Sequence, residues 1–348
     1  MKSIVAVSLL VIVCTTATVN AKEVVIKDVK QTYWASTTIQ KYVANGYVAL
    51  DKGCFYPNRA ITRGEMADIL VKTLRLQKDA TVELTATDIT SQHPHYNALR
   101  KLVELDVLNN SKQLKPDSTL TRAQMAKIIA LAFQIEVDNK NKTTFKDYKS
   151  TYWAKHYIET LADEKIIQGK TKTRFAPEDS VTRAQFVTLI SRAKSFSTKV
   201  KNLEMGYDLL SKGYIDTKQT NHKMVVDVIE IVNKERAAKG LKAVQEDKYL
   251  NQLATVKLND MLQRNYFEHE SPYYGFPWEM ANYFDYEFRS LGENLAKNLN
   301  TPTSVMKGWM ASPKHKENIL KSNYTHIGLA VKRDHRGNYM WVQLFSSK

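Results

Sequence analysis

Cysteine is scarce in this chain, with 2 residues among 348, and this scarcity excludes a fold held together by disulfide bonds. Cys14 falls in an N-terminal segment that we expect to be removed, so that Cys54 would remain alone. A lone thiol can act as a nucleophile when a neighbouring base activates it. The residues around Cys54 supply no such base, and we interpret it as an inert, partly buried thiol.

Long apolar runs are also lacking. The run at residues 4–13 follows Lys2 and is too short for a membrane-spanning helix, which needs about 20 residues. Small residues at 19–21 resemble a signal cleavage site, so the pattern predicts a secretory signal peptide over residues 1–21. An uncleaved anchor and a lipid on Cys14 are the alternatives. We expect an exported mature chain with no transmembrane segment.

Acidic residues are outnumbered: 36 Asp and Glu stand against 51 Lys and Arg, a net charge of +15, in a chain that is 43% apolar. Such a composition predicts folded domains, two or three at this length. The excess lies in the front part, with +11 over residues 22–223 and +3 over residues 224–348. A basic segment suits a polyanion. An exported protein rarely meets nucleic acid, so we expect anionic wall polymer and no nucleic acid as partner.

Internal repetition organises the front part. The spacing proline, five residues, arginine occurs at Pro57–Arg63, Pro116–Arg122 and Pro177–Arg183. An aspartate precedes each copy, and a tryptophan follows the first and third aspartates: Asp28, Asp88, Asp147, Trp34 and Trp153. A period of about 60 residues, with apolar helical segments on both sides of the proline, predicts units of helix, loop and helix. One unit cannot bury its own apolar face, so the units should pack on one another.

A capping pattern marks the helix after each proline. Thr62, Thr121 and Thr182 are followed three positions later by Glu65, Gln124 and Gln185, as in a capping box. Each repeat arginine then begins a helix, where free N–H groups and the helix dipole favour an anion. The guanidinium adds bidentate anion binding, and tryptophan offers a platform for a sugar ring. Alternatively, the arginines only pair with the aspartates and the tryptophans are core; three copies at fixed spacing favour ligand binding.

The three units resemble S-layer homology (SLH) domains, at residues 24–76, 84–135 and 143–195. The resemblance implies an all-α, pseudo-threefold bundle that binds the pyruvylated secondary cell-wall polysaccharide of Gram-positive bacteria non-covalently. The implied binding residues are Asp28, Trp34 and Arg63 in the first unit, Asp88 and Arg122 in the second, and Asp147, Trp153, Gly169 and Arg183 in the third. The second unit departs from the pattern, because Pro94 stands in place of the tryptophan and Asn110 in place of the loop glycine.

A different organisation follows the repeats. Residues 196–223 mix Lys, Ser, Gly and Thr and are interpreted as a linker with one helix near residues 203–210, separating two independent cores. Beyond it, apolar periodicity predicts helices from residue 225, over 250–262 and from Pro302, then two strands at 327–331 and 340–345 with a turn between them. Helices followed by a terminal hairpin predict an α+β sandwich.

Hydrolase signatures of the HExxH or GxSxG type are absent from the chain. Polar groups gather instead at residues 267–272, 292–295 and 312–320, where two histidines and a glutamate form a plausible metal or acid–base set: His269, Glu293 and His315. The alternative is that His315 and the neighbouring asparagines, Asn294 and Asn318, are hydrogen-bonded structural groups.

These stretches resemble the SCP-like CAP domain (cysteine-rich secretory, antigen 5, pathogenesis-related) in its cysteine-free bacterial form, over residues 225–348. The resemblance implies an α-β-α sandwich with a cleft holding two histidines and two glutamates, a set that binds zinc in some members. His269 and Glu293 match directly, His315 comes from the SPxH stretch, and Ser312 stands where the second glutamate is expected. The resemblance thus names zinc as candidate cofactor, with His269 and His315 as candidate ligands.

Two classes of function follow from these resemblances. The leading hypothesis is a secreted protein of a Gram-positive cell wall or S-layer, held by its repeats and displaying a domain that binds an extracellular ligand. The alternative is a wall-anchored, metal-dependent hydrolase that uses the same cleft. A third possibility is that the last domain is only a structural spacer.

Overall fold

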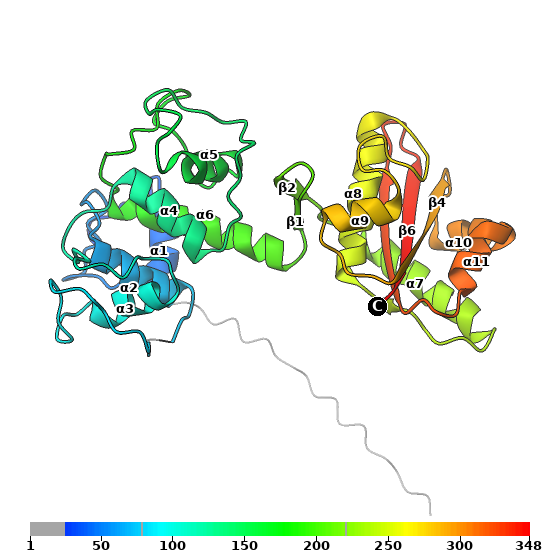
Figure 1. The fold of residues 1–348 in the computed structure, drawn as a ribbon, viewed down its shortest axis with the longest axis horizontal. Helices are drawn as coiled ribbons and strands as arrows, with labels where there is room; N and C mark the ends of the chain where they lie inside the picture. Colours follow the sequence, from blue (N-terminus) through cyan, green and yellow to red (C-terminus); the bar gives the residue numbers. More distant parts are fainter. Residues whose placement is uncertain (1–24, 78, 220) are drawn as a thin grey trace, which may run out of the picture.

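The computed structural model describes residues 25–77, 79–219 and 221–348; the expected signal peptide, residues 1–21, lies outside them. Two bodies are joined through a small hairpin (Figure 1). The N-terminal body is helical, and its helices are α1 (Ser36–Ala44), α2 (Arg63–Thr73), α3 (Tyr96–Glu104), α4 (Arg122–Ala132), α5 (Lys155–Asp163) and α6 (Arg183–Lys201). Each repeat contributes a helix, a loop and a second helix, as the sequence predicts.

The second helix of each repeat begins at a capping box. The side chains of Thr62, Thr121 and Thr182 each accept a hydrogen bond from the backbone N–H three residues later, and the Glu or Gln there bonds back. Reciprocal bonds of this kind satisfy N–H groups that a helix leaves unpaired at its start. The predicted caps are confirmed, and the repeat arginine is the first residue of each of these helices.

A closed ring of backbone hydrogen bonds joins the three repeats. Ile61 N donates to Val181 O at 2.9 Å, Val181 N to Leu120 O at 2.9 Å, and Leu120 N to Ile61 O at 3.1 Å. All three side chains are fully buried in one apolar core that runs through the repeats. Since each unit bonds to the next and the third bonds to the first, the three units share one core.

The segment after α6 is a hairpin, which corrects the predicted helix near residues 203–210. Strands β1 (Met205–Asp208) and β2 (Gly213–Asp216) pair in antiparallel fashion. Leu203, with φ of 61°, turns the chain out of α6 before β1 begins. Tyr214 packs edge-on against Phe196 of α6 with ring centroids 4.7 Å apart, and buried Asp208 accepts a hydrogen bond from Tyr274 Oη at 2.7 Å. The β1–β2 hairpin therefore contacts both bodies.

The C-terminal body is a four-stranded sheet in the order β3-β5-β6-β4 between two helical layers (Figure 1). Its elements are α7 (His222–Ala237), β3 (Gln245–Glu246), α8 (Lys248–Arg264), α9 (Pro277–Tyr283), β4 (Ser290–Lys297), α10 (Pro302–Ala311), α11 (Pro313–Leu320), β5 (His326–Arg333) and β6 (Tyr339–Ser347). Alternate residues of β6 point to opposite faces: Trp341 and Phe345 join the core with α7 and α10, and Val342 and Leu344 the core with α8. This is the predicted α-β-α layering.

Strand β4 lies at an edge of the sheet and carries Glu293 and Asn294, two of the polar residues singled out in the sequence. The predicted helices and the β5–β6 hairpin are present, whereas β4 was not predicted from the sequence. Polar side chains inside this strand weaken its apolar alternation, and its pairing with β6 over residues 290–297 supplies the order instead.

Candidate functional site

The repeat aspartates shape the loops of their own repeats. Asp28 accepts hydrogen bonds from Phe55 N at 2.7 Å and Tyr56 N at 2.6 Å. The same pair of bonds recurs from Leu114 N and Lys115 N to Asp88, and from Phe175 N and Ala176 N to Asp147. Each aspartate therefore pins the loop that precedes the proline, and its carboxylate is occupied by backbone donors.

The repeat arginines reach across to the neighbouring repeat. Their Nε atoms donate to carbonyls of the pinned loops: Arg63 to Leu114 at 2.7 Å, Arg122 to Phe175 at 2.8 Å, and Arg183 to Phe55 at 2.8 Å. The structure thus groups Arg183 with Asp28, Arg63 with Asp88, and Arg122 with Asp147. This corrects the sequence-based grouping within single repeats.

The first backbone N–H groups of α2, α4 and α6 already donate hydrogen bonds to carbonyls of neighbouring repeats. The expectation of free N–H groups for an anion is therefore wrong. In α4, Arg122 N donates to Asp179 O at 2.9 Å and Ala123 N to Pro177 O at 2.9 Å, and equivalent bonds hold α2 and α6. The next amide donates to the capping threonine. An anion at these sites must therefore be bound by the guanidinium rather than by the helix terminus.

The two repeat tryptophans are surface residues. Trp34 is 61% exposed and Trp153 52%, so neither belongs to the core. The tyrosines before them donate to the loop after the proline, Tyr33 to Asn58 at 3.1 Å and Tyr152 to Glu178 at 2.6 Å. These bonds orient the backbone from which each exposed indole projects.

The junction between the first and second repeats is built differently. His93 takes the place of the tyrosine, with Nε2 3.8 Å from a carboxylate oxygen of Asp117, so Pro94 does take the place of the tryptophan. His95 Nδ1 lies 2.6 Å from Asp68 Oδ2 of α2. Its ring covers Gly64, where a Cβ atom would lie 2.2 Å from His95 Cδ2. The imidazole therefore fills space beside Arg63.

Gly169 shapes the loop beside Arg122. A Cβ atom there would lie 2.4 Å from both Phe145 Cε1 and Thr171 O, so no larger residue fits without moving the loop. The preceding carbonyl, Gln168 O, accepts from a terminal nitrogen of Arg122 at 2.8 Å, and the guanidinium stacks 4.3 Å from the centre of the Phe175 ring.

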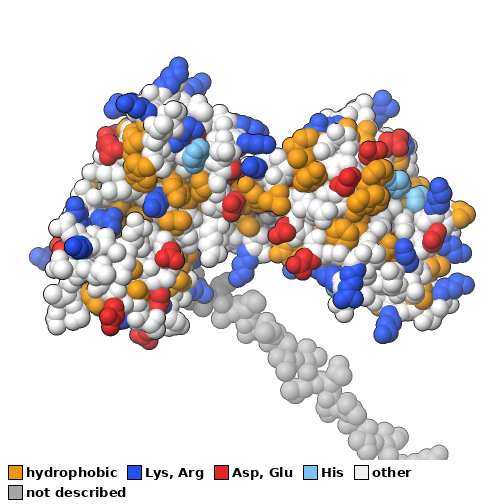
Figure 2. All heavy atoms as spheres, in the orientation of Figure 1, with side chains coloured by type: hydrophobic (Ala, Val, Ile, Leu, Met, Phe, Trp, Pro, Cys, Tyr) orange, Lys and Arg blue, Asp and Glu red, His pale blue; other side chains and the backbone are white. Residues whose placement is uncertain are grey.

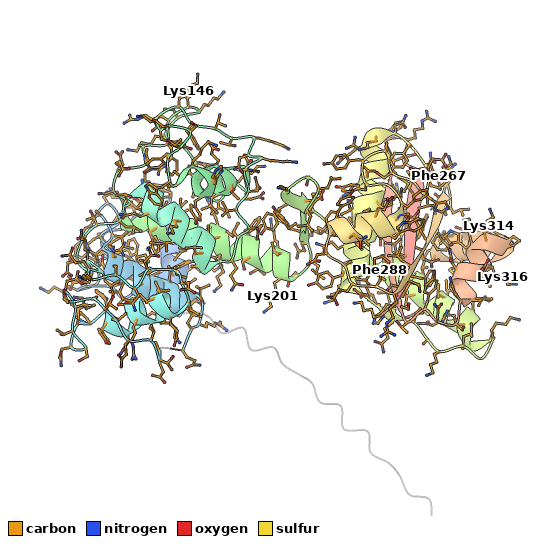
Figure 3. The ribbon with its side chains drawn as sticks, viewed as in Figure 1. Lys146, Lys201, Phe267, Phe288, Lys314 and Lys316 are labelled. Atoms are coloured by element: carbon orange, nitrogen blue, oxygen red, sulfur yellow. The ribbon has the colours of Figure 1, made fainter. Side chains whose placement is uncertain are left out.

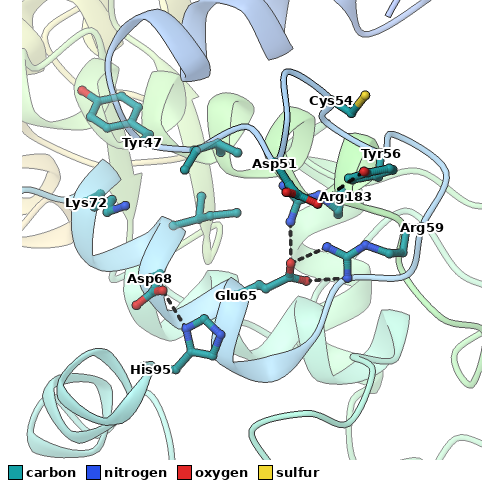
Figure 4. Close-up of a pocket in the computed structure, with 13 residues that line it drawn as sticks. Tyr47, Asp51, Cys54, Tyr56, Arg59, Glu65, Asp68, Lys72, His95 and Arg183 are labelled. Carbon is teal, nitrogen blue, oxygen red and sulfur yellow. Dashed lines mark hydrogen bonds and ion pairs between the residues drawn. The ribbon is translucent and has the colours of Figure 1, made fainter. Parts of the chain in front are cut away.

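A pocket of about 460 Å³ opens beside Arg183 (Figure 4). Arg183 donates to Glu65 Oε1 at 2.7 Å, and Arg59 also pairs with Glu65. Burial opposes ionisation of Glu65, yet the hydrogen bonds from Arg59 and Thr62 and the charge of Arg183 lower its pKa. Arg122 makes no ion pair with any residue in the described part of the chain, and in the third repeat, which Arg122 faces, the residue equivalent to Glu65 is Gln185.

The C-terminal candidate site centres on a histidine and a glutamate in hydrogen-bond contact. His269, in the loop after α8, lies with Nδ1 2.7 Å from Glu293 Oε1 on β4. The imidazole is 54% exposed, and the carboxylate is buried beneath it. The hydrogen bond to Glu293 raises the pKa of His269 against the opposing effect of burial, and burial raises the pKa of Glu293.

His315 on α11 approaches from the other side of the edge strand. Asn294 Nδ2 donates to the His315 carbonyl and Asn318 Nδ2 to the Glu293 carbonyl, each at 3.1 Å, so the two asparagines tie α11 to β4. Burial and the charge of His269 lower the pKa of His315. Lys314 and Lys316 flank it and point outward (Figure 3).

The expected metal set is not assembled. Within residues 25–77, 79–219 and 221–348, no group of three or more His, Cys, Asp or Glu is arranged to hold a metal ion. Ser312 joins α10 to α11 and adds no carboxylate. A residue that sequence reasoning missed is Lys257 of α8, whose ammonium donates to the His269 carbonyl at 2.8 Å. A lysine inside an amphipathic helix carries no signal of this role.

The histidine pair predicts a measurable titration. In the full-length protein the pKa of His269 should lie above 6.5, because Glu293 stabilises the imidazolium, and it should fall in Glu293→Gln. NMR titration of the His269 ring protons measures both values, and exposed His335 in the same spectrum is the internal control. A pKa that Glu293→Gln leaves unchanged would contradict the pairing.

Comparison with known proteins agrees with both resemblances. Residues 25–67, 87–126 and 144–187 match the S-layer homology domain, and residues 229–345 match the cysteine-rich secretory protein family, CAP. The chain carries three SLH repeats and a CAP domain. No helix among the described residues is long and apolar enough to cross a membrane.

Relatives match either part of the chain. Uncharacterized protein YkwD of Bacillus subtilis (strain 168) is 42% identical over 121 residues, 35% of this chain and 46% of the relative. An S-layer protein of Bacillus thuringiensis subsp. finitimus is 26% identical over 214 residues, 60% of this chain and 26% of the relative. The chain thus covers less than half the length of each. The matches to SLH domains and S-layer proteins indicate a cell-surface, wall-associated protein.

One solved structure similar to this chain is an extracellular protein containing a SCP domain from Bacillus anthracis str. Ames. It is 22% identical, with a TM-score of 0.34, over 44% of this chain and 50% of that one.

Proposed function

We propose that the SLH repeats form a pseudo-threefold bundle that holds the chain on the wall of a Gram-positive bacterium by binding anionic, pyruvylated secondary polysaccharide between neighbouring repeats. The observation that carries this proposal is the recurring arrangement of an arginine from one repeat against the aspartate-pinned loop of the next. The first and third repeats also present an exposed tryptophan beside the loop that the arginine contacts: Trp34 in the first repeat and Trp153 in the third. A guanidinium binds an acidic substituent, and an indole packs on a sugar ring.

The three junctions between repeats, called grooves here and named by their arginines, differ in what they offer an anion. The Arg122 groove combines a guanidinium without an ion pair among the described residues with Trp153 in the adjoining repeat. The Arg183 groove has Trp34, but its guanidinium already pairs with Glu65, so an acidic ligand must compete with that carboxylate. The Arg63 groove has no tryptophan, and the His95 imidazole, which packs on Gly64 next to Arg63, also lines the Arg183 pocket. We therefore propose the Arg122 groove as the principal site.

This ranking predicts unequal effects of arginine substitutions. Arg63→Gln should lower the affinity for wall polysaccharide less than threefold, whereas Arg122→Gln should lower it about tenfold or more, since a charge-assisted hydrogen bond contributes about 1.5–3 kcal/mol. Calorimetry with the full chain measures both. Thermal unfolding serves as control, because each arginine also bonds a loop carbonyl. Equal losses in affinity would refute the ranking.

The anchored chain displays the CAP domain, and we propose that its cleft binds an extracellular ligand. The support is the exposed imidazole of His269, whose Nδ1 is held by a buried carboxylate. Such a group recognises a hydrogen-bonding ligand and also forms the base of an acid–base pair. Anchoring of the chain to the wall by the SLH repeats does not depend on ligand binding by the CAP domain.

Wall fractionation tests the anchoring directly. The full chain should sediment with wall material that retains its secondary polysaccharide and stay in the supernatant when that polymer has been extracted. Free polysaccharide should release the bound protein by competition. Equal sedimentation with extracted walls would assign the contact to peptidoglycan and overturn the proposal.

A further inference from the structure

Three aromatic side chains lie at the surface of the CAP domain, in the segment that follows His269. Tyr273 is 40% exposed, Phe276 36% and Trp278 47%. Figure 2 shows hydrophobic side chains gathering at the surface of the C-terminal body. Leaving an aromatic ring in water forgoes the burial of about 150–250 Å², and a contiguous exposed patch of such rings marks a binding surface.

Two of these rings form a flat surface. The rings of Phe276 and Trp278 lie nearly parallel, with an interplanar angle of 10° and centroids 4.8 Å apart. We call this pair the aromatic platform. Tyr273 is arranged differently, because the guanidinium of Arg264 lies 4.7 Å from its ring centroid. A flat aromatic surface packs on the C–H face of a sugar ring.

Hydrogen bonds fix the backbone that carries the aromatic platform. Ser271 and Gly275 exchange two backbone hydrogen bonds, at 2.7 and 3.0 Å, and Ser271 Oγ accepts from Tyr274 N at 2.9 Å. Phe276 N donates to Glu279 Oε2 at 2.7 Å. The rings are therefore held in place before a ligand arrives, and a preformed surface loses little conformational entropy on binding.

The charge around the aromatic platform favours a neutral partner. Residues 265–288, between α8 and β4, contain no Lys or Arg and five acidic residues: Glu268, Glu270, Glu279, Asp285 and Glu287. The first two flank His269 and are exposed. Carboxylates repel an anionic polymer and a surface of anionic lipid, so this segment opposes both.

The helix that carries Trp278 also supplies a hydrogen-bonding group. Asn282 is exposed and lies four residues after Trp278 on α9, so the two side chains share one face of the helix. A side-chain amide donates from its N–H groups and accepts at its oxygen, which matches the hydroxyl and acetamido groups of a sugar. An indole beside an amide therefore suits a neutral, N-acetylated sugar.

We propose that the aromatic platform binds a neutral, N-acetylated glycan, the chemistry of the peptidoglycan backbone. The inference rests on the proposed anchoring, which places the CAP domain among such strands, and it names the class of ligand for this domain. Trp278 packs on the sugar ring, and Asn282 bonds the acetamido group. One small platform binds glycan weakly, so anchoring supplies the local concentration, and the platform alone does not retain the chain on extracted walls.

Titration of the full chain with a soluble tetrasaccharide of N-acetylglucosamine tests the proposal without any wall polymer. NMR of the tryptophan indole N–H groups should show the Trp278 signal shifting at millimolar sugar. Trp278→Ala should weaken this binding about tenfold or more, because the indole provides most of the contact, whereas Trp278→Tyr keeps a ring and should retain most of it. Trp34→Ala is the matched control, since that exposed indole lies in the SLH body, and it should bind the tetrasaccharide as the wild type does.

Two results would overturn the proposal. One is a wild-type Trp278 signal that the tetrasaccharide leaves in place, which would assign the aromatic platform to a protein partner. The other is equal affinity of the wild type and Trp278→Ala for the tetrasaccharide. Failure of the anchoring gives a different pattern, in which the chain no longer sediments with complete walls while the tetrasaccharide still shifts the Trp278 signal.

Discussion

Replacing both groove tryptophans, in the variant Trp34→Ala/Trp153→Ala, is expected to lower the affinity for wall polysaccharide at least about tenfold, equivalent to about 1.4 kcal/mol. Both indoles are more than half exposed, so their loss removes ligand contact without opening a cavity in the core. Because the two grooves act together on one polymer, loss of both should exceed the loss of either alone.

The control for this experiment is Trp278→Ala, which removes an indole of similar exposure from the CAP domain. It should leave polysaccharide binding unchanged, and circular dichroism should show all variants folded. If the groove variant binds as tightly as the Trp278 variant, the tryptophans are not part of the polysaccharide site.

Arg236→Met is expected to destabilise the CAP domain by about 3 kcal/mol, because several carbonyls lose a buried donor. Arg236 is fully buried, and its guanidinium donates to the carbonyls of Lys242, Ile319, Lys321 and Tyr324 at 2.8–3.2 Å. Two of these carbonyls end α11, the helix that carries His315. Urea unfolding measures the loss, and Arg289→Met, at an exposed arginine, is the control. Equal midpoints for the two variants would contradict this role.

The repeat architecture was predictable because its signals are local. Pro57, Thr62 and Arg63 recur at fixed spacing, and the capping box depends only on residues three positions apart. The partner of each arginine was not predictable, because it lies on the next repeat. Arg183 bonds Phe55 O, 128 residues away, and only closure of the ring of repeats brings the two together.

In the C-terminal domain too, local sequence patterns were predictable and tertiary contacts were not. Apolar periodicity predicted α8 and the β5–β6 hairpin, whereas β4 and the β1–β2 hairpin depend on tertiary pairing that outweighs local pattern. Contact between His269 and Glu293 was expected from the family resemblance and is present at 2.7 Å. The contact of Lys257 with the His269 carbonyl follows from the packing of α8 on the sheet, which the sequence alone does not reveal.

Removal of the acidic groups from the polymer tests the central claim most directly. The quantity to measure is the affinity of the full chain for purified wall polysaccharide before and after that removal. Tight, salt-sensitive binding before removal and loss of binding afterwards is the predicted result, since the groove guanidiniums then have no anion to hold. Equal affinity for both forms of the polymer would contradict the account.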